Sequence, residues 1–409
     1  MTSPTPTLDR RDERLRPDGA GGLRGFIDAV RGGDIGALPV VLGLIVIAVI
    51  FQILNPFFLS SANLVNLALQ SAAVGTITLG VVFILLAGQI DLSVGSVSGL
   101  SASVIAVLFV HLDWPMWASI IAALLVGPVI GFLYGLLYIR FGVPSFVITL
   151  AGLLAVLGMQ LTVLGGNGSI NIPFDSWLVQ FAQQTFLPPW LSYLLVAVIV
   201  AAFVAFSIAR AQRRRAAELS VRPFWTVLVM AALLLVVLAL VVWYLNLSRG
   251  VPAMFLFFIA LVLIAQYALT RTSWGRSVYA IGGNVEAARR SGIRVNRVYM
   301  SLFIICSTLA AAGGLLAAGR LASANPSSGG GDVNLNAIAA AVIGGTSLFG
   351  GRGSAFSAVL GILVIGSIAS GLTLLNLPSA IQFMITGGVL IVAVIIDAIS
   401  RRSRAAHGR

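Results

Sequence analysis

The feature that most constrains this chain is a succession of long apolar runs separated by short polar segments. The runs begin at Leu38 and recur almost to the C-terminus of the 409 residues. About 20 apolar residues in a helix are enough to cross the ~30 Å hydrocarbon core of a bilayer. Only 9% of the residues are charged, against roughly 25% in a soluble domain. The sequence therefore predicts an all-α integral membrane protein.

Hydropathy predicts a polytopic helical bundle of about 12 spans. An Arg-rich cytoplasmic loop, residues 210–223, separates a first transmembrane half (38–209) from a second (224–399), and residues 1–37 and 400–409 are predicted cytoplasmic tails. The predicted spans are 38–54, 67–87, 92–110, 116–139, 145–164, 191–209, 224–247, 253–269, 298–318, 337–348, 355–375 and 379–399.

Charge placement predicts the orientation of these spans. All 25 basic residues are Arg, and with an even number of spans and both termini in the cytoplasm, only Arg249 and Arg320 fall on the outer side. Arg-rich loops are typical of the cytoplasmic side of a membrane. The net charge of +12 is therefore assigned to loops that face the cytoplasm and anionic lipid, and no nucleic-acid partner is expected.

Several kinds of chemistry are disfavoured by residue type. A P-loop needs a lysine that reaches the nucleotide phosphates, and the chain has no lysine. Zinc and iron–sulfur sites need clustered Cys and His, but the chain has one Cys, Cys306, and two His. We therefore expect no metal site, no catalytic residue and no cofactor in this chain, and an intramembrane enzyme is disfavoured.

Two of the predicted spans are poor candidates for straight helices. Residues 92–110 are rich in Ser and Gly, and residues 337–348 are too short to cross alone and lead into Gly-rich sequence. Irregular backbone at membrane depth is tolerated only inside protein or beside a water-filled cavity. Broken or re-entrant helices beside a pathway are therefore predicted.

Polar residues at the first break are candidate pathway or structural groups: Gln89, Asp91 and Ser93. An Asp at the centre of a membrane helix costs about 2.5–3.5 kcal/mol on insertion scales. Three roles for Asp91 remain open: a polar group of a pathway, a proton- or cation-coupling acid of a secondary transporter, and a cap on the following helix.

A stripe of small residues lies on one predicted helix, where Gly127, Gly131 and Gly135 are four residues apart. This spacing lets two membrane helices approach closely. It predicts packing and carries no information about a substrate.

The longest polar interruption of the second half is the loop 271–297. Asn284 can cap a short helix from Val285 to Ser291, and Gly292 can end it. A short helix bearing Ala and Arg suits docking against another protein, and binding of anionic lipid headgroups is the alternative.

Three ordered motifs resemble the ribose/xylose family of sugar permeases, which serve bacterial binding-protein-dependent ABC importers. The first is Ile90-Asp91-Leu92-Ser93-Val94-Gly95, and the second is Gly282-Gly283-Asn284 followed by Glu286-Ala287-Ala288 and Gly292. The third runs from Ala337 through Gly344-Gly345-Thr346-Ser347-Leu348 to Gly350-Gly351. Residues 144–154 and the additional central apolar segments are most similar to xylose-type members.

The resemblance implies a permease in the inner membrane that carries a monosaccharide, with a pentose such as xylose as the first expectation. It implies a second permease chain, two ATPase subunits that bind ATP and Mg, and a periplasmic or lipoprotein sugar-binding protein. The candidate coupling residues toward the ATPase are Gly283, Asn284, Glu286, Ala287, Ala288 and Gly292. Asn334 and Asn336 are further pathway candidates, and they stand where the family often has acidic residues.

Overall fold

A computed structural model describes residues 38–219, 221, 223–389, 391 and 395. The predicted tails, residues 1–37 and 400–409, and the end of the last predicted span lie outside the described residues. Contacts between residues divide the described chain into two compact units, one formed by residues 187–251 and the other by the segments before and after them. These units do not coincide with the two sequential halves divided at the Arg-rich loop.

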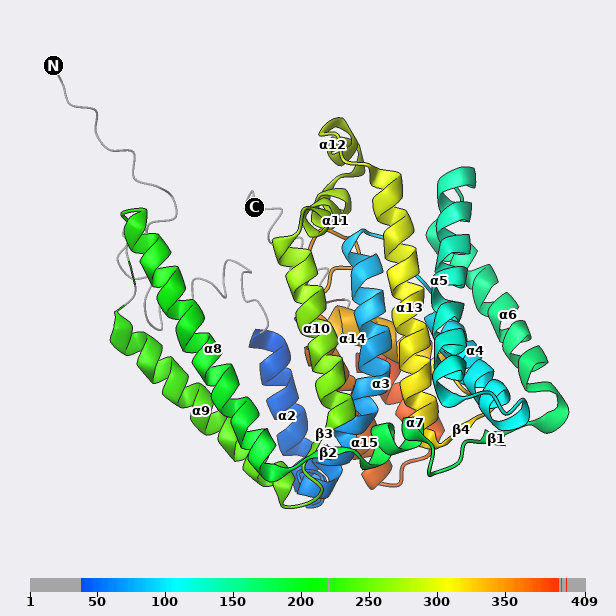
Figure 1. The fold of residues 1–409 in the computed structure, drawn as a ribbon, viewed down its shortest axis with the longest axis horizontal. Coiled ribbons are helices and arrows are strands. Elements are labelled where there is room, and N and C mark those ends of the chain that lie inside the picture. Colours follow the sequence, from blue (N-terminus) through cyan, green and yellow to red (C-terminus); the bar gives the residue numbers. More distant parts are fainter. Residues whose placement is uncertain (1–37, 220, 222, 390, 392–394, 396–409) are drawn as a thin grey trace. The chain divides into compact units, whose positions relative to one another are not determined.

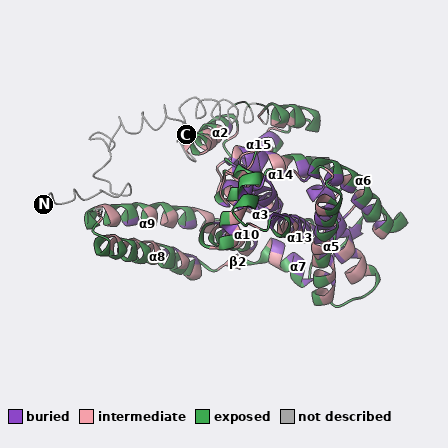
Figure 2. Cartoon of the chain, turned by 90° about the horizontal axis from the view of Figure 1, so that it is seen from above, coloured by how far each residue is buried: buried purple, intermediate pink, exposed green. Residues whose placement is uncertain are grey.

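The smaller unit is a helical hairpin of α8 (Pro189–Ala216) and α9 (Phe224–Asn246), which pack against each other. Most of their residues are exposed (Figure 2), as expected for apolar helices that face lipid. Arg213, Arg214 and Arg215 lie in the last turn of α8.

The larger unit contains the remaining helices and two strands of two residues each, which are described below. Its long helices are α2 (Leu38–Leu54), α3 (Ser61–Leu86), α4 (Val94–Ala106), α5 (Met116–Phe141), α6 (Ser145–Leu164), α10 (Ala253–Arg271), α13 (Val295–Leu321), α14 (Gly331–Ile343) and α15 (Phe356–Leu374). Its short helices are the π-helical turns η2 (Val107–His111) and η4 (Gln180–Gln184), the 3-10 turn η3 (Gly165–Asn167), α7 (Trp177–Val179), α11 (Ser273–Gly283) and α12 (Val285–Arg290). The short strands β2 (Phe186–Leu187) and β3 (Val251–Pro252) lie where the chain passes between the two units.

Within the described residues, nine helices are long and apolar enough to cross a membrane, counting α4 and η2 as one. Three shorter apolar helices lie at 38–54, 332–343 and 379–389. The predicted bounds of α2 and α6 agree with the structure at both ends. The number of about 12 crossings stays a prediction.

The centre of the larger unit is α3, which is buried along almost all of its length and contacts α13, α10, α14 and α15. Figure 1 shows α10, α3 and α13 side by side, with α11 and α12 at one end of this unit. At the other end, β1 (Ile170–Asn171) pairs antiparallel with β4 (Ser323–Ala324). These ends are called the α12 end and the β1–β4 end below.

The predicted glycine stripe packs α5 against α13. A Cβ atom on Gly131 would lie 2.5 Å from the Phe303 carbonyl oxygen and 2.6 Å from the Ile304 Cα atom. Gly127 lies equally close to the backbone of Ser307. The close helix approach predicted from the spacing is therefore confirmed.

Gly131→Val is expected to destabilise the protein by at least about 1–3 kcal/mol, as an overpacked core does, because the side chain would meet α13 backbone that cannot rotate away. The matched control is Gly158→Val on α6, where a Cβ has no neighbour within 4 Å. The thermal unfolding midpoint of each purified variant in detergent measures the effect. Equal midpoints for the two variants would show that the α5–α13 contact does not stabilise the bundle.

Both helix breaks that the sequence predicts are present, but their bounds differ. The helix predicted at residue 92 begins at Val94, after an irregular segment of residues 87–93. The span predicted at 337–348 is wrong at both ends, because α14 runs from Gly331 to Ile343 and the chain turns at Gly344. Hydropathy placed this helix too late because the first turn of α14 contains Asp332 and Asn334 and reads as polar loop.

The segment that contains α14 connects the two ends of the larger unit. Ser323 lies in β4 at the β1–β4 end, and the Gly351 N–H donates to the Leu86 carbonyl oxygen (2.8 Å) near the α12 end. Thirteen residues of α-helix span only about 20 Å. The chain therefore crosses this unit as one short helix with irregular backbone before it, residues 325–330, and after it, from residue 344.

Candidate functional site

The predicted coupling segment forms two short helices separated by a single cap residue. Asn284 follows the last residue of α11 and caps the N-terminus of α12. Its Oδ1 accepts a hydrogen bond from the Ala287 N–H (3.0 Å). After Arg290 and Ser291, the chain leaves the helix at Gly292 with φ +85°. The short helix and both of its predicted boundary residues are confirmed, with the helix one residue shorter than expected.

Five of the six predicted coupling residues are exposed at the α12 end: Gly283, Asn284, Glu286, Ala287 and Gly292. Ala288 is buried, so it anchors α12 and is not available to a partner. Glu286 accepts a hydrogen bond from Arg289 (3.0 Å), and both side chains are largely exposed. Such a pair contributes about 0.2–1 kcal/mol, so this surface is held mainly by Ala288 and the Asn284 cap.

The second and third sequence motifs meet next to this segment, together with the end of α3 that precedes the first motif. Gly282 lies so close to the Leu86 carbonyl oxygen and the Gly351 N–H that a Cβ would overlap both. Leu86 ends α3, and Gly351 follows α14. We call this contact of residues 86–88, 279–283 and 350–353 the coupling junction.

Tyr279 adds a side-chain hydrogen bond to the coupling junction. Its hydroxyl donates to the Gly353 carbonyl oxygen (2.9 Å). Burial raises the pKa of the Tyr279 hydroxyl above its ordinary value, so the group remains a donor at neutral pH. A movement of α11 would therefore pull on the loop that follows α14.

Asp91 lies in the first irregular segment and is almost completely buried, at 1% exposure. Its Oδ1 accepts hydrogen bonds from the Ser93 N–H (2.8 Å) and the Ser93 hydroxyl (2.7 Å). The Cys306 thiol of α13 lies 3.7 Å from its Oδ2. Of the three roles left open by the sequence, this geometry favours a structural anchor that turns the chain into α4.

The backbone of the first irregular segment is held by α6. The Ile90 N–H donates to the Ser145 hydroxyl (3.3 Å), and the Leu92 N–H donates to the Thr149 hydroxyl (3.1 Å). These side chains satisfy backbone groups that no helix pairs, which is the condition for irregular structure at membrane depth.

Residues 325–330, the irregular segment before α14, are held by α6, and the first turn of α14 is held by α4. The Gln160 amide donates to the carbonyl oxygens of Asn325 (3.2 Å) and Ser328 (2.9 Å). The Gly95 N–H donates to the Asn334 Oδ1. The N-terminal turns of α4 and α14 therefore meet inside the bundle, an arrangement typical of transporters with discontinuous helices.

Sequence reasoning missed Ser145, Thr149 and Gln160, although their spacing carries a signal. With the buried Gly152 and Val156, they lie on one face of α6 at intervals of three and four residues. Polar residues on the buried face of an apolar helix indicate hydrogen bonding inside the bundle.

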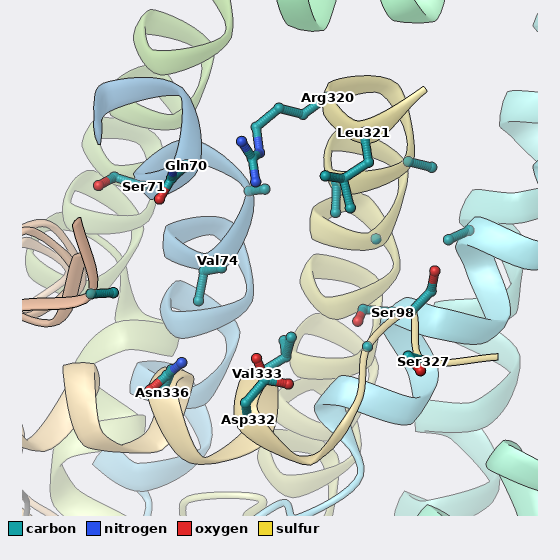
Figure 3. A pocket seen from close by; sticks show the side chains of 18 of the residues that line it. Gln70, Ser71, Val74, Ser98, Arg320, Leu321, Ser327, Asp332, Val333 and Asn336 are labelled. Atoms are coloured by element: carbon teal, nitrogen blue, oxygen red, sulfur yellow. The ribbon is translucent and has the colours of Figure 1, made fainter. Parts of the chain in front are cut away.

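A cavity of about 360 Å³ lies beside the meeting point of α4 and α14 (Figure 3). Of the predicted pathway residues, Asn336 lines this cavity, whereas Gln89, Asp91, Ser93 and Asn334 do not. Asn334 is 6% exposed and accepts a hydrogen bond from the Gly95 N–H. Gln89 is half-buried near the α12 end. The structure thus separates the predicted polar residues into anchors of the helix breaks and one cavity residue.

Broken helices that meet inside an apolar bundle, a partly polar cavity beside them and an α11–α12 segment in contact with both breaks are features of a multi-pass membrane permease. Residues 63–394 match the family model described as branched-chain amino acid transport system / permease component. The chain belongs to this permease family.

Relatives within this family cover most of the chain. It is 38% identical over 345 residues to the xylose transport system permease protein of Escherichia coli (strain K12), covering 84% of this chain and 87% of that protein. The Haemophilus influenzae xylose transport system permease protein is 35% identical over 369 residues, covering 89% and 97%. The ribose import permease protein of Bacillus subtilis (strain 168) is 32% identical over 356 residues, covering 87% and 91%. No solved structure matches the chain.

Proposed function

We propose that this chain is the membrane permease subunit of an ATP-driven importer that carries a monosaccharide, most specifically a pentose such as xylose, across the inner membrane of a bacterium. The observation that supports this most strongly is the coupling junction, where the exposed α11–α12 segment contacts the backbone at both helix breaks. The relatives described as xylose and ribose permeases supply the substrate class.

The proposed assembly has two permease chains, two ATPase subunits beneath them and a sugar-binding protein above. ATP and Mg bind in the ATPase subunits, since this chain has no lysine for a P-loop. In this arrangement the α12 end and both termini face the cytoplasm, in accord with the Arg placement, and Arg-rich loops contact anionic lipid. Closure of the ATPases would move α12, and the coupling junction would pass this movement to the breaks after α3 and α14.

A secondary transporter that uses Asp91 as a coupling acid is not favoured. The Asp91 carboxylate is almost completely buried, holds Ser93 and does not line the cavity. A coupling acid must exchange its proton or cation with a water-accessible path.

Uptake into proteoliposomes tests the proposed function. The permease is reconstituted with its ATPase and binding protein, and uptake of radiolabelled D-xylose, D-ribose and L-leucine is followed with ATP supplied to the ATPase. We expect pentose uptake that requires ATP hydrolysis and binding protein and continues when a protonophore removes the proton gradient.

Two results would contradict this assignment in different ways. Pentose uptake that collapses with the proton gradient and ignores ATP would support the secondary transporter. Uptake of L-leucine alone would place the substrate with the amino acids named in the family description and not with the sugars.

A further inference from the structure

The cavity beside the helix breaks is polar on part of its wall and is lined by segments far apart in the sequence. α3, α4, α13, α14 and α15 all contribute residues to it. Its volume of about 360 Å³ lies within the range of roughly 300–1,000 Å³ for small-molecule sites. Figure 3 shows Arg320 extending from α13 toward Gln70 of α3, with Asp332 and Asn336 on the α14 side.

Four side chains in this cavity have hydrogen-bonding capacity that the described part of the chain does not use. Gln70, Arg320, Asp332 and Asn336 make no side-chain hydrogen bond or ion pair with the described residues. The Ser71 hydroxyl, at 1% exposure, also has no partner there. Polar groups inside a membrane protein are costly unless they are satisfied, and they mark substrate pathways.

The charges in the cavity indicate what it would bind. One cation, Arg320, and one anion, Asp332, line the same space, so a ligand with charge of a single sign that is attracted by one would be repelled by the other. The amides of Gln70 and Asn336 can each donate and accept hydrogen bonds. A neutral ligand that carries several hydroxyl groups matches this mixture of donors and acceptors.

Much of the rest of the wall is apolar. Val74, Ile362 and Ile365 face the same space as the polar residues. A monosaccharide has both hydroxyl groups and a C–H face, and both parts therefore find complementary surface. A lipid chain would leave Arg320 and Asp332 unpaired.

We propose that this cavity is a monosaccharide site within each permease chain, in which Gln70, Arg320, Asp332 and Asn336 bind the sugar hydroxyls. The assignment rests on the proposed function as a sugar permease. It adds a link to the ATP-driven movement, because α14 carries Asp332 and Asn336 and leads at its other end into the coupling junction. Movement of α14 would change the cavity and release the sugar.

Cysteine protection tests this site without relying on transport. The only native thiol, Cys306, is fully buried, so the wild-type permease serves as the unlabelled blank. In Asn336→Cys, the rate of modification by a small polar thiol reagent is expected to fall at least several-fold at saturating D-xylose or D-ribose. In Ser169→Cys, on the exposed loop after α6, the sugars should leave the rate unchanged.

A second variant guards against loss of folding. If Asn336→Cys does not yield a monodisperse protein, Ser327→Cys at the exposed rim of the same cavity replaces it. Adding Asp332→Asn should raise the sugar concentration for half-protection several-fold, whereas adding Asp175→Asn, outside the cavity, should not.

The outcomes separate this proposal from the proposed function. No protection by a sugar that the wild-type complex carries in proteoliposomes would overturn the cavity assignment and leave the sugar permease standing. Protection by L-leucine but not by any monosaccharide would overturn the assignment of the ligand. Absence of monosaccharide uptake by the wild-type complex would instead refute the proposed function.

Discussion

An Asp91→Leu permease is expected to lose most of its folded population, whereas Asp91→Asn keeps it. Leucine would leave the Ser93 N–H and hydroxyl without their acceptor at a buried position. An unsatisfied buried polar group costs about 1–3 kcal/mol, and two groups are affected. Asparagine retains an Oδ1 that can accept the same hydrogen bonds. The free energy of unfolding of Asp91→Asn should therefore fall by only about 1 kcal/mol.

The yield of monodisperse protein in detergent and its thermal unfolding midpoint measure this difference. Asp175→Leu is the matched control, because Asp175 lies exposed on the loop between β1 and α7, and exposed substitutions usually change stability by less than about 0.5 kcal/mol.

Other outcomes would assign Asp91 a different role. If Asp91→Leu unfolds like the wild type, Asp91 does not anchor α4. If Asp91→Asn folds normally but no longer transports, the carboxyl group itself is needed, and the pathway or coupling-acid role is favoured.

Gly282→Ala is expected to uncouple ATP hydrolysis from sugar uptake while leaving the permease in the membrane with its ATPase bound. The added Cβ would overlap the Leu86 carbonyl oxygen and the Gly351 N–H, which are backbone atoms that cannot rotate away. Either the hydrogen bond between Leu86 and Gly351 breaks or α11 shifts. Coupling energies of about 1–3 kcal/mol correspond to roughly 5- to 150-fold changes in an equilibrium constant. We expect the rate of sugar uptake to decrease by a factor of this size.

Gly283→Ala is the control for this prediction, since it changes the adjacent residue and its Cβ would have no neighbour within 4 Å. Co-purification of the ATPase, sugar-stimulated ATP hydrolysis and uptake are measured for both variants. Equal uptake in Gly282→Ala and the wild type would show that the coupling junction does not transmit the movement. Equal losses in both variants would assign the effect to the ATPase-facing surface.

Much of this architecture follows from the sequence alone, because burial in lipid and helix capping depend on residues close together in the chain. Apolar runs bounded by Pro144 and Gly165 define α6 from end to end. Asn284 and Gly292 define the short helix α12 through a side-chain cap and a positive φ angle. The spacing of Gly127 and Gly131 predicts a close helix contact without naming its partner.

The partner of each irregular segment was decided only by the tertiary structure. The sequence indicates breaks near residue 92 and in the Gly-rich sequence from Gly344 to Gly353, but not that Gly282 lies against both Leu86 and Gly351. Nor does hydropathy show that Asn334 binds Gly95 while Asn336 faces a cavity, since residues two apart on a helix point in different directions. Local sequence determines where regular hydrogen bonding stops, and packing of distant segments determines which groups satisfy the backbone there and which polar side chains remain free for a ligand.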